Sequence, residues 1–342
     1  MPSVLYTRQM SDLISVIIPA RNTGATIGVC LDAVFAFTHD NFEVIVVDDA
    51  SEDDTADIAR QFSCTLLSLD VQSGAAKARN VGAEQATGKI FFFTDADCVP
   101  LPDALEVALN TLRECKEQTV LGGTYTAMSF DNRFFSNFQS VFINYSETKS
   151  AENPDYIATH AMAISAELFR KHFGFRENHL PILEDVEFSH RLRSAGVELQ
   201  LDPNIKVRHI FNFNLLGSMR NAFRKSMYWI IYSIGNRDIL SDSGTASIGL
   251  KVNAGLFMVS LMLLAMFAIL GNTMFVYSVG VLELINVYIN RGQLTAFYRA
   301  GGIMFGLIST LYYLFIYPIP VASGTVMGML KYIMRIFRGN NQ

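Results

Sequence analysis

The stretch Lys89-Ile-Phe-Phe-Phe-Thr94 runs directly into Asp95-Ala-Asp97. Its first part is an unbroken apolar run, which is typical of a strand buried on both faces of a parallel sheet. Two carboxylates follow at the point where that strand must end. In sheets of this kind, ligands bind beyond the carboxyl ends of the strands. The stretch therefore predicts a mostly parallel sheet with an acidic site at one edge.

The segments around this strand alternate between strand and helix patterns. We predict strands at residues 15–20, 43–49 and 66–69, and helices at residues 26–37, 51–61 and 75–85. The helix at 51–61 is expected to begin at a capping box that starts with Ser51 and ends with Asp54. Farther along, the pattern predicts helices at 102–118, 165–173 and 184–196, strands at 119–128 and 199–209, and an amphipathic helix at 215–234. Strands separated by helices indicate βαβ units and an α/β fold.

Charge is distributed unevenly along the 342 residues. Up to Lys251 the net charge is −9, whereas the remainder carries five basic residues and one acid, a net charge of +4. A globular part this acidic would repel phosphates, which argues against a nucleic-acid-binding function. The four cysteines show no metal-binding spacing, so we expect reduced thiols in the cytosol.

Two long stretches, residues 252–282 and 300–330, contain no charged residue. As a single helix each would be about 46 Å long, against a hydrocarbon core of about 30 Å. We expect a break at Gly271-Asn272 and a break or kink at Pro318-Ile-Pro320, which gives two to four membrane spans. The chain shows no apolar signal peptide, and basic residues flank the uncharged stretches. These patterns predict a multi-pass protein of the cytoplasmic membrane whose globular part faces the cytosol.

Asp95 and Asp97 form the first candidate site. Like charges at close range resist joint ionisation unless a cation lies between them. Carboxylate oxygens suit Mg²⁺ or Mn²⁺, and these ions bridge phosphate oxygens. The alternative is that the two acids cap a helix and form a turn before Pro100.

A second acidic pair, Asp48-Asp49, ends the predicted strand at 43–49. One of these acids could accept hydrogen bonds from a nucleobase or a ribose, as acids after such strands do. The alternative is that both cap the following turn together with Ser51. The sequence has no G-x-G-x-x-G fingerprint after its first strand and no G-x-x-x-x-G-K-[ST] loop, which excludes dinucleotide binding of that type and the P-loop enzymes.

Five short motifs occur in the order and spacing of one enzyme family. They are Ser15-Val-Ile-Ile-Pro19, Val47-Asp-Asp-Ala-Ser51, Ala78-Arg-Asn-Val-Gly82, Thr94-Asp-Ala-Asp97 and Leu183-Glu-Asp185. Over about residues 13–210 the chain resembles the family 2 glycosyltransferases, which are inverting enzymes of the GT-A fold. We therefore divide the chain into a GT-A catalytic domain at residues 1–212, amphipathic interfacial helices at 213–250 and a transmembrane region at 251–342.

The resemblance implies a nucleotide-sugar donor, either a UDP-sugar or a GDP-sugar. Asp49, with Asp48 as a second candidate, would hold the base. The pocket for the nucleotide would be lined by Pro19, Ala20 and Arg21.

The resemblance also implies roles for the phosphates and the metal. Arg79, beside Lys77, would lie near the ribose and the phosphates, unless both belong to a solvated helix face. Asp95 and Asp97 would organise the metal and the diphosphate, and Asp97 would be the more direct ligand.

Glu184-Asp185 is the third element of the predicted site. An inverting transfer needs a base that takes the proton from the attacking hydroxyl. The family places that base on the second residue of this motif, here Asp185. The alternative is that Asp185 is an acid at a helix N-terminus, where the helix dipole favours negative charge.

Two weaker candidates lie farther along the chain. His209 ends the last predicted strand, where some family members have a further metal ligand, although a structural or acceptor-side histidine fits equally well. The segment Met219-Arg-Asn-Ala-Phe-Arg224 resembles the Q-x-x-R-W helix of processive synthases, whose arginine contacts the pyrophosphate, but it lacks the Gln and the Trp. We prefer the alternative of an interfacial helix, in which Arg220 and Arg224 meet lipid headgroups and Trp229 lies at the membrane boundary.

The leading hypothesis is a membrane-anchored inverting glycosyltransferase of cell-envelope glycan synthesis. Its acceptor would be a glycolipid, a polyprenyl-linked glycan or a polyprenyl phosphate. A processive polysaccharide synthase is the alternative within the enzyme class, and a catalytically silent nucleotide-sugar-binding scaffold is the alternative outside it. A transporter is disfavoured, because the apolar part has only one acid, Glu283.

Overall fold

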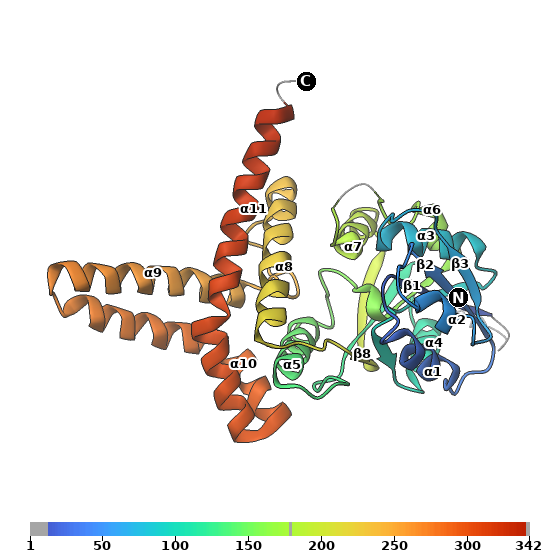
Figure 1. Cartoon of the computed structure of the whole chain (residues 1–342), viewed down its shortest axis with the longest axis horizontal. Helices are drawn as coiled ribbons and strands as arrows, with labels where there is room; N and C mark the ends of the chain where they lie inside the picture. Colours follow the sequence, from blue (N-terminus) through green and yellow to red (C-terminus); the bar gives the residue numbers. More distant parts are fainter. Residues whose placement is uncertain (1–12, 178–179, 340–342) are drawn as a thin grey trace, which may run out of the picture. The chain divides into compact units, whose positions relative to one another are not determined.

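The computed structural model describes residues 13–177 and 180–339 and consists of two compact units (Figure 1). The N-terminal unit comprises Met1–Thr126 and Ser150–Ile210. The C-terminal unit comprises Ala127–Lys149 and Phe211–Gln342. The predicted absence of a signal peptide concerns the first residues of the chain, and residues 1–12 lie outside the described part.

The described residues of the N-terminal unit form an eight-stranded sheet with the order β3-β2-β1-β4-β7-β6-β8-β5. Strands β3, β2, β1 and β4 are parallel to one another, and β6 is parallel to β8. Strand β7 is antiparallel to both of its neighbours, and β5 is antiparallel to β8. The strands are β1 (Ile14–Ala20), β2 (Phe42–Asp48), β3 (Thr65–Ser68), β4 (Ile90–Phe93), β5 (Cys98–Pro100), β6 (Thr119–Tyr125), β7 (Met162–Ser165) and β8 (Glu198–His209).

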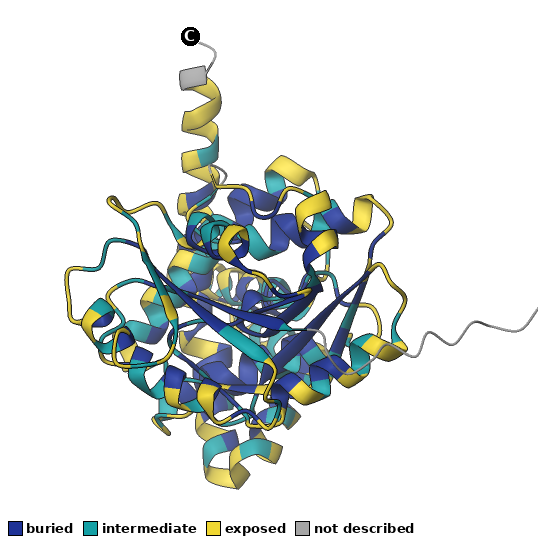
Figure 2. Cartoon of the chain, turned by 90° about the vertical axis from the view of Figure 1, so that its right-hand side faces the viewer, coloured by how far each residue is buried: buried dark blue, intermediate teal, exposed yellow. Residues whose placement is uncertain are grey.

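Helices cover both faces of this sheet, whose strands are largely buried (Figure 2). Phe91 and Phe93 of β4 pack against Phe169, with ring centroids 5.5 and 5.3 Å apart. On the opposite face Phe92 meets Phe37 at 6.3 Å. The apolar side chains of β4 therefore pack on both faces of the sheet, as predicted. The helices of this unit are α1 (Ile27–Phe35), α2 (Thr55–Ala59), α3 (Ala75–Gln85), α4 (Ala104–Glu114), the short η1 (Thr159–Ala161), α6 (Ala166–Lys171) and α7 (Glu184–Ser194).

The predicted strands and helices of this unit are confirmed, with one error at a helix start. Helix α2 begins at Thr55, and its cap residue Asp54 makes no side-chain cap hydrogen bond. The Ser51 hydroxyl instead accepts the backbone N–H of Asn22 at 2.9 Å, and Asp53 accepts the backbone N–H of Thr55 at 3.1 Å. The predicted capping box is therefore wrong, because Ser51 is used to hold the neighbouring loop. Strands β5 and β7 were not among the predicted strands.

The C-terminal unit is helical in its described residues. Its helices are α5 (Phe134–Thr148), α8 (Leu215–Asn236), α9 (Ile248–Leu270), α10 (Met274–Leu311), the π-helical η2 (Tyr312–Ile316) and α11 (Pro318–Gly339). Gly271 ends α9 with φ +69°, so the predicted break at Gly271-Asn272 is confirmed. Pro318 begins α11 directly after η2, and Tyr317 between them keeps a helical conformation, so the helical stretch is not interrupted at the predicted second position. Gly302, with φ +75°, adds a kink inside α10 that the sequence analysis did not anticipate.

Helix α5 belongs to the C-terminal unit, although the range 1–212 groups it with the sheet. Its Phe138 stacks on Phe297 at 5.1 Å and meets the edge of Tyr312 at 4.7 Å. Phe297 is fully buried. Aromatic packing thus ties a segment from the middle of the chain to helices near its end.

Helices α8 and α11 approach each other very closely. A Cβ atom on Gly324 would lie 2.4 Å from the carbonyl oxygen of Phe223, and one on Gly328 would lie 2.4 Å from that of Met227. Two small residues four positions apart allow this backbone contact. Trp229 of α8 is buried, and its position at a membrane boundary stays a prediction.

A ladder of polar side chains runs between α9, α10 and η2, and we call it the polar ladder. Asn286 donates to Asn253 at 2.9 Å, and Asn290 donates to Asn286 at 2.9 Å. Tyr313 donates its hydroxyl to Asn290 at 2.9 Å, and Ser260 donates to Glu283 at 3.1 Å. Uncharged hydrogen bonds of this kind join helices in apolar surroundings. The polar ladder consists of Asn253, Ser260, Glu283, Asn286, Asn290 and Tyr313.

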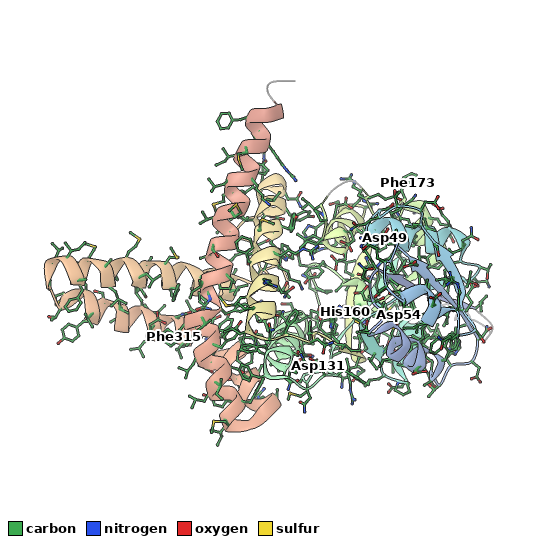
Figure 3. All side chains as sticks on the ribbon, viewed as in Figure 1. Asp49, Asp54, Asp131, His160, Phe173 and Phe315 are labelled. Carbon is green, nitrogen blue, oxygen red and sulfur yellow. The ribbon has the colours of Figure 1, made fainter. Side chains whose placement is uncertain are left out.

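Two helical stretches of the described chain are long and apolar enough to cross a membrane. They are Ile248–Leu270 and Met274–Phe337, and the mean hydropathy of an 18-residue segment within each is 2.2 and 1.6. Many of their apolar side chains project outward (Figure 3) and are exposed, such as Ile269 and Leu284. Length and composition thus agree with the predicted membrane region, in which the number of spans stays a prediction.

Candidate functional site

The carboxyl ends of β2, β1 and β4 bring three of the sequence motifs to one edge of the sheet. Ala20 at the end of β1 is in register with Asp48 of β2, and Ile17 is in register with Phe93 of β4. The chain continues from these ends into Arg21, Asp49 and the acidic motif that begins at Asp95. Parallel pairing therefore gathers side chains that are far apart in the sequence.

Asp49 is buried and holds the loop before α3. One of its carboxylate oxygens accepts the backbone N–H of Ser73 at 2.6 Å, and the other accepts that of Gly74 at 2.8 Å. Gly74 has φ +92°, a conformation that glycine adopts without strain. Asp48 accepts the backbone N–H of Ser51 at 3.2 Å, as the turn-capping alternative expects. Contact of either acid with a nucleotide stays a prediction.

Pro19, Ala20 and Arg21 lie beside Asp49. The carbonyl oxygen of Ala20 accepts the backbone N–H of Asp49 at 2.8 Å. The Arg21 guanidinium donates to the carbonyl oxygen of Asp49 at 2.9 Å. Ala50, the next residue, has φ +53°, a left-handed conformation that is uncommon for a residue with a side chain. The predicted nucleotide-pocket residues are therefore neighbours at a locally strained turn.

Arg79 is the centre of the charge arrangement. It is only 4% exposed, and its guanidinium contacts Asp95 at 2.6 Å and Glu184 at 2.6 Å. Its Cζ lies 5.8 Å from the ring centroid of Phe175. The alternative of a solvated helix face is therefore wrong for Arg79. One guanidinium joins the motif at the end of β4 to the motif at the start of α7.

This arrangement changes the acidity of the groups involved. Burial alone would raise the pKa of Asp95, but the Arg79 guanidinium outweighs it and holds that pKa below its usual value. Burial also works against the charge of Arg79, yet the two carboxylates raise its pKa. Asp95 is therefore a carboxylate that is already neutralised by a protein cation.

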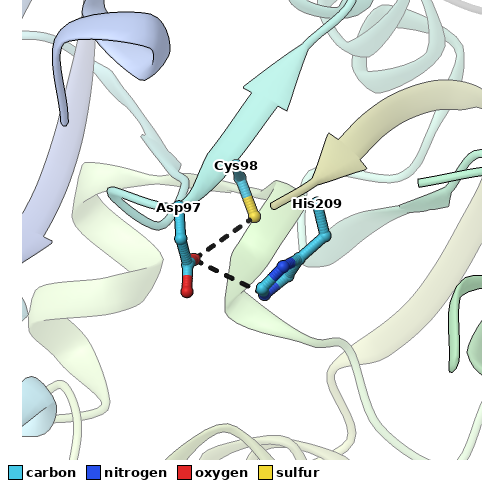
Figure 4. A group of neighbouring side chains, drawn as sticks. All are labelled: Asp97, Cys98 and His209. Atoms are coloured by element: carbon cyan, nitrogen blue, oxygen red, sulfur yellow. Dashed lines mark hydrogen bonds and ion pairs between the residues drawn. The ribbon is translucent and has the colours of Figure 1, made fainter. Parts of the chain in front are cut away.

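Asp97 and His209 lie together, as the predicted metal site requires (Figure 4). Asp97 Oδ1 is 3.5 Å from His209 Nε2 and 3.9 Å from the Sγ of Cys98. The donor atoms of these three residues all lie within 4.8 Å of one another. Asp95, the other predicted ligand, is not part of this group. Carboxylate and imidazole donors fit a divalent ion such as Mn²⁺, so the residues present are compatible with a metal.

Strand pairing and aromatic contacts hold this group in place. Cys98 and His209 are paired residues of the antiparallel strands β5 and β8. The His209 ring meets the Tyr125 ring edge to face at 5.2 Å, and Tyr125 stacks on His160 at 4.0 Å. Burial raises the pKa of Asp97 and the Asp95 carboxylate adds to the rise, whereas His209 opposes it. Sequence reasoning missed Cys98, Tyr125 and His160, which no motif marks.

Glu184 and Asp185 begin α7. Leu183 precedes them with φ +74°, so the helix starts from a strained residue. Asp185 is half-buried and accepts the backbone N–H of Val186 at 2.8 Å. Glu184 pairs with Arg79, so it is a partner of the arginine. The base role of Asp185 stays a prediction.

Glu184 also borders a pocket of about 260 Å³. The backbone that Asp49 holds, Ser73 and Gly74, lines the same pocket. The start of α3 therefore meets the start of α7 at a solvent-accessible hollow. The remaining lining residues are Ala75, Ala76, Glu177, Leu180 and Pro181.

Two predicted binding residues are exposed or partly exposed. Lys77 is partly exposed and contacts Glu177 at 3.4 Å. Arg224 is exposed on α8 in the C-terminal unit, as is Arg220. A nucleotide or lipid role of Arg224 stays a prediction.

Comparison with known proteins identifies the domain that carries this site. Residues 15–173 match the sequence profile described as glycosyl transferase family 2. The chain carries a family 2 glycosyltransferase domain. The matched range includes the acidic motif at Asp95, whereas Asp185 and His209 follow it.

Relatives of this glycosyltransferase domain occur in archaea and bacteria. Glycosyltransferase AglE of Haloferax volcanii is 32% identical over 193 residues, which are 54% of this chain and 63% of that protein. The UDP-Glc:alpha-D-GlcNAc-diphosphoundecaprenol beta-1,3-glucosyltransferase WfgD of Escherichia coli is 33% identical over 103 residues, or 29% of this chain and 41% of that protein. The chain thus spans less than two thirds of the length of these relatives.

A solved structure shares the fold. Mannosyltransferase PcManGT from Pyrobaculum calidifontis, in complex with GDP-Man and Mn²⁺, aligns with a TM-score of 0.57 and 18% identity. The alignment covers 94% of this chain and 87% of that chain. The predicted GT-A fold followed by a helical region is confirmed.

Proposed function

We propose that the protein is a membrane-anchored inverting glycosyltransferase that moves a sugar from a nucleotide diphosphate to a membrane-associated acceptor. The observation that carries the proposal is the position of Arg79 between Asp95 and Glu184. Through these contacts one buried cation fixes two motifs, and each motif continues into a candidate functional acid, Asp97 or Asp185. A structural core without a catalytic task has no need of such a cluster of charge.

Asp97 and His209 are the residues that would hold a divalent ion, Mg²⁺ or Mn²⁺. When bound, such an ion neutralises the charge that develops on a departing diphosphate. Asp95 stays ionised beside Arg79 and keeps the guanidinium directed at this edge of the sheet. Mn²⁺ in the related mannosyltransferase structure supports a metal at this site.

Asp185 would take the proton from an acceptor hydroxyl as that hydroxyl attacks the anomeric carbon. One base suffices for an inverting displacement, because the leaving diphosphate needs no acid of its own. Glu184 would not compete for this role, because its carboxylate is already paired with the Arg79 guanidinium. An acceptor phosphate is already ionised, so the presence of Asp185 favours a sugar hydroxyl.

The donor would bind at the turn that Asp49 organises. The remaining lone pairs of the Asp49 carboxylate and the remaining N–H groups of the Arg21 guanidinium would supply acceptors and donors for a base, a ribose and phosphates. The related proteins are named with UDP-Glc and with GDP-Man, which supports a UDP- or GDP-sugar.

The acceptor would be lipid-linked and presented at the cytoplasmic face of the membrane. The apolar helices Ile248–Leu270 and Met274–Phe337 support an anchor by their length and composition. WfgD is named for an acceptor on diphosphoundecaprenol, which supports an acceptor of this class. Anchoring confines enzyme and acceptor to one surface and raises their effective concentration.

The test is a transfer assay on the full chain in detergent, with Mg²⁺ or Mn²⁺, a panel of nucleotide-sugars and polyprenyl-linked acceptors. We expect nucleotide diphosphate release with one donor and a product of inverted anomeric configuration by NMR. Asp185→Asn should slow the transfer by about 10²- to 10⁴-fold. Asp97→Asn should slow it by about 10²-fold or more, since an electrostatic contribution to the transition state is lost.

Asp57→Asn is the matched control, because Asp57 is an exposed acid that pairs only with Arg60 in its own segment among the described ion pairs. It should transfer at the rate of the wild type. Transfer that survives both Asp97→Asn and Asp185→Asn would refute the assignment of the site.

A further inference from the structure

Cys98 is a buried thiol for which the proposed transfer has no use. Its Sγ lies 3.9 Å from Asp97 Oδ1, and Asp97 Oδ1 lies 3.5 Å from His209 Nε2. The three donor atoms converge on one space (Figure 4). Oxygen, nitrogen and sulfur donors together form a set that borderline and soft divalent ions prefer over Mg²⁺.

We propose that Cys98 is a third protein ligand at the Asp97–His209 site, so that the site binds Zn²⁺, Co²⁺ or Cd²⁺ more tightly than Mg²⁺. This inference refines the proposed function. It rests on that proposal for the role that the bound metal would have in catalysis. It assigns a ligand that the D-x-D motif does not contain.

Two of the three separations between the donor atoms are close to those of such a site. Metal–sulfur bonds of about 2.3 Å and metal–oxygen or metal–nitrogen bonds of about 2.0–2.2 Å place the donors of a tetrahedral site about 3.3–3.6 Å apart. The pair Asp97–His209 already has this separation, at 3.5 Å. The pair Asp97–Cys98, at 3.9 Å, needs to close by a few tenths of an ångström.

The backbone holds the three residues near this arrangement without an ion. Cys98 is paired with His209 across β5 and β8. The Asp97 carbonyl accepts the backbone N–H of Ile210 at 2.8 Å, which extends the same register by one residue. When Cys98 binds a metal its thiol proton leaves to solvent, and the thiolate with the Asp97 carboxylate balances the two positive charges.

Cys30 provides a matched comparison. It is also a fully buried thiol near the acidic motif, and its Sγ lies 3.5 Å from the carbonyl oxygen of Asp95. It is not part of the converging donor group. If a buried thiol only fills apolar space, as Cys30 does, its replacement by serine should leave metal binding unchanged. Replacement of a thiol that is a metal ligand should weaken the binding.

The experiment titrates the purified full chain with Co²⁺ and Cd²⁺ in the absence of nucleotide. We expect a thiolate-to-metal charge-transfer band in the near ultraviolet for the wild type and for Cys30→Ser. In Cys98→Ser the band should be lost and the affinity for Cd²⁺ should fall about tenfold or more, since even indirect supports of a metal site carry effects of that size. Asp97→Asn should also weaken binding.

Cys98→Ser could lose the band because it misfolds, so a second variant tests the same inference with Cys98 retained. The chain has four cysteines, so the triple variant Cys30→Ser, Cys64→Ser, Cys115→Ser keeps only Cys98. It should retain the band. A wild type without the band, or a triple variant that has lost it, overturns the inference.

The outcomes also separate this inference from the proposed function. Sugar transfer with Mg²⁺ by a protein that shows no band refutes the Cys98 ligand and leaves the glycosyltransferase in place. A band that requires Cys98 in a protein that transfers no sugar supports the ligand and contradicts the proposed function.

Discussion

The two units of the protein bury polar groups in opposite ways. The N-terminal unit buries charge, with Arg79 held between Asp95 and Glu184. The C-terminal unit builds its polar ladder mainly from neutral amides, such as Asn253 and Asn286, and includes the single acid Glu283. The difference teaches that this chain places the most buried cation of its described ion pairs at the candidate site and uses mainly neutral hydrogen bonds in the polar ladder.

Physical chemistry explains why buried ion pairs and buried neutral hydrogen bonds are not interchangeable. A charge that leaves water loses several kcal/mol of hydration, and only a close partner restores it. An amide loses much less and needs only one or two hydrogen bonds. Removing one member of a charge cluster should therefore have a larger effect than removing one member of the polar ladder.

The largest expected effect follows from Arg79→Met. Its removal leaves Asp95 and Glu184 as two partly buried carboxylates without their cation, which should lower the free energy of unfolding by about 3 kcal/mol. That is the low end of the range for buried pairs, because Asp95 is 28% exposed. Denaturant unfolding, followed by hydrogen exchange in strands β1 and β4, measures the loss.

Arg79→Lys is the control for this change, since it keeps the charge but not the planar fork that reaches two carboxylates. It should recover part of the lost stability. If Arg79→Met lowers the free energy of unfolding by less than about 1 kcal/mol, the cluster contributes no more than an ordinary surface ion pair. The contrast between buried charge in one unit and neutral hydrogen bonds in the other would then not hold.

The next effect is the pH dependence of the same cluster. Arg79 lowers the pKa of Asp95 below its usual value of 3.8, so the ionised carboxylate stabilises the folded state above that pH. The stabilisation is lost as the pH falls from 3.8 through the lowered pKa of the folded protein. Denaturant unfolding at a series of pH values should show a steeper loss on acidification for the wild type than for Asp95→Asn. Equal slopes would show that Arg79 does not hold Asp95 ionised.

A smaller effect is expected in the polar ladder. Asn286 is fully buried, and Asn286→Leu leaves Asn253 without its donor, which should cost about 1–2 kcal/mol. The fluorescence of Trp229, the one tryptophan of the chain, reports unfolding of the C-terminal unit. The effect should not vary between pH 5 and 8, because no charge is removed.

Ser278→Ala is the matched control on the same helix, since Ser278 is exposed and bonds only to the Met274 carbonyl oxygen among the described residues. It should leave the Trp229 transition unchanged. An Asn286→Leu protein as stable as the wild type would show that the polar ladder contributes no stability.

The smallest effect is expected for Lys77→Met. Lys77 lies two residues from Arg79 on α3, but it is partly exposed and 3.4 Å from its partner Glu177. Exposed pairs contribute about 0–1 kcal/mol, so the free energy of unfolding should change by less than that. A loss as large as that of Arg79→Met would mean that charge anywhere on α3 matters, and not only the buried cluster.

The sequence predicted the sheet well where local pattern decides the structure. Strand β4 is an unbroken apolar run, and helix α3 occupies the predicted residues 75–85. Strand β5 escaped prediction because it has three residues and ends in proline, so it exists only through its pairing with β8. Helix α5 escaped because aromatic contacts with Phe297 and Tyr312 define its place, and these lie far along the chain.

The sequence predicted the acidic residues of the candidate site but not the residues that contact them. The D-x-D motif marked Asp97, the end of the last predicted strand marked His209 as a weaker candidate, and the structure brings these two together. Nothing in the sequence shows that Arg79 is buried, because its partner Glu184 lies 105 residues away. The same holds for Cys98, whose neighbour His209 becomes visible only through the pairing of β5 with β8.

The central claim is that the edge of the sheet at Asp97 binds a metal together with a nucleoside diphosphate. Calorimetric titration of the full chain with UDP and with GDP, in the presence of Mn²⁺, tests it directly. One of the two nucleotides should bind the wild type and Asp185→Asn alike, and its affinity should fall about tenfold or more in Asp97→Asn. Equal affinity of Asp97→Asn and the wild type, or binding of neither nucleotide to the wild type, would contradict the account.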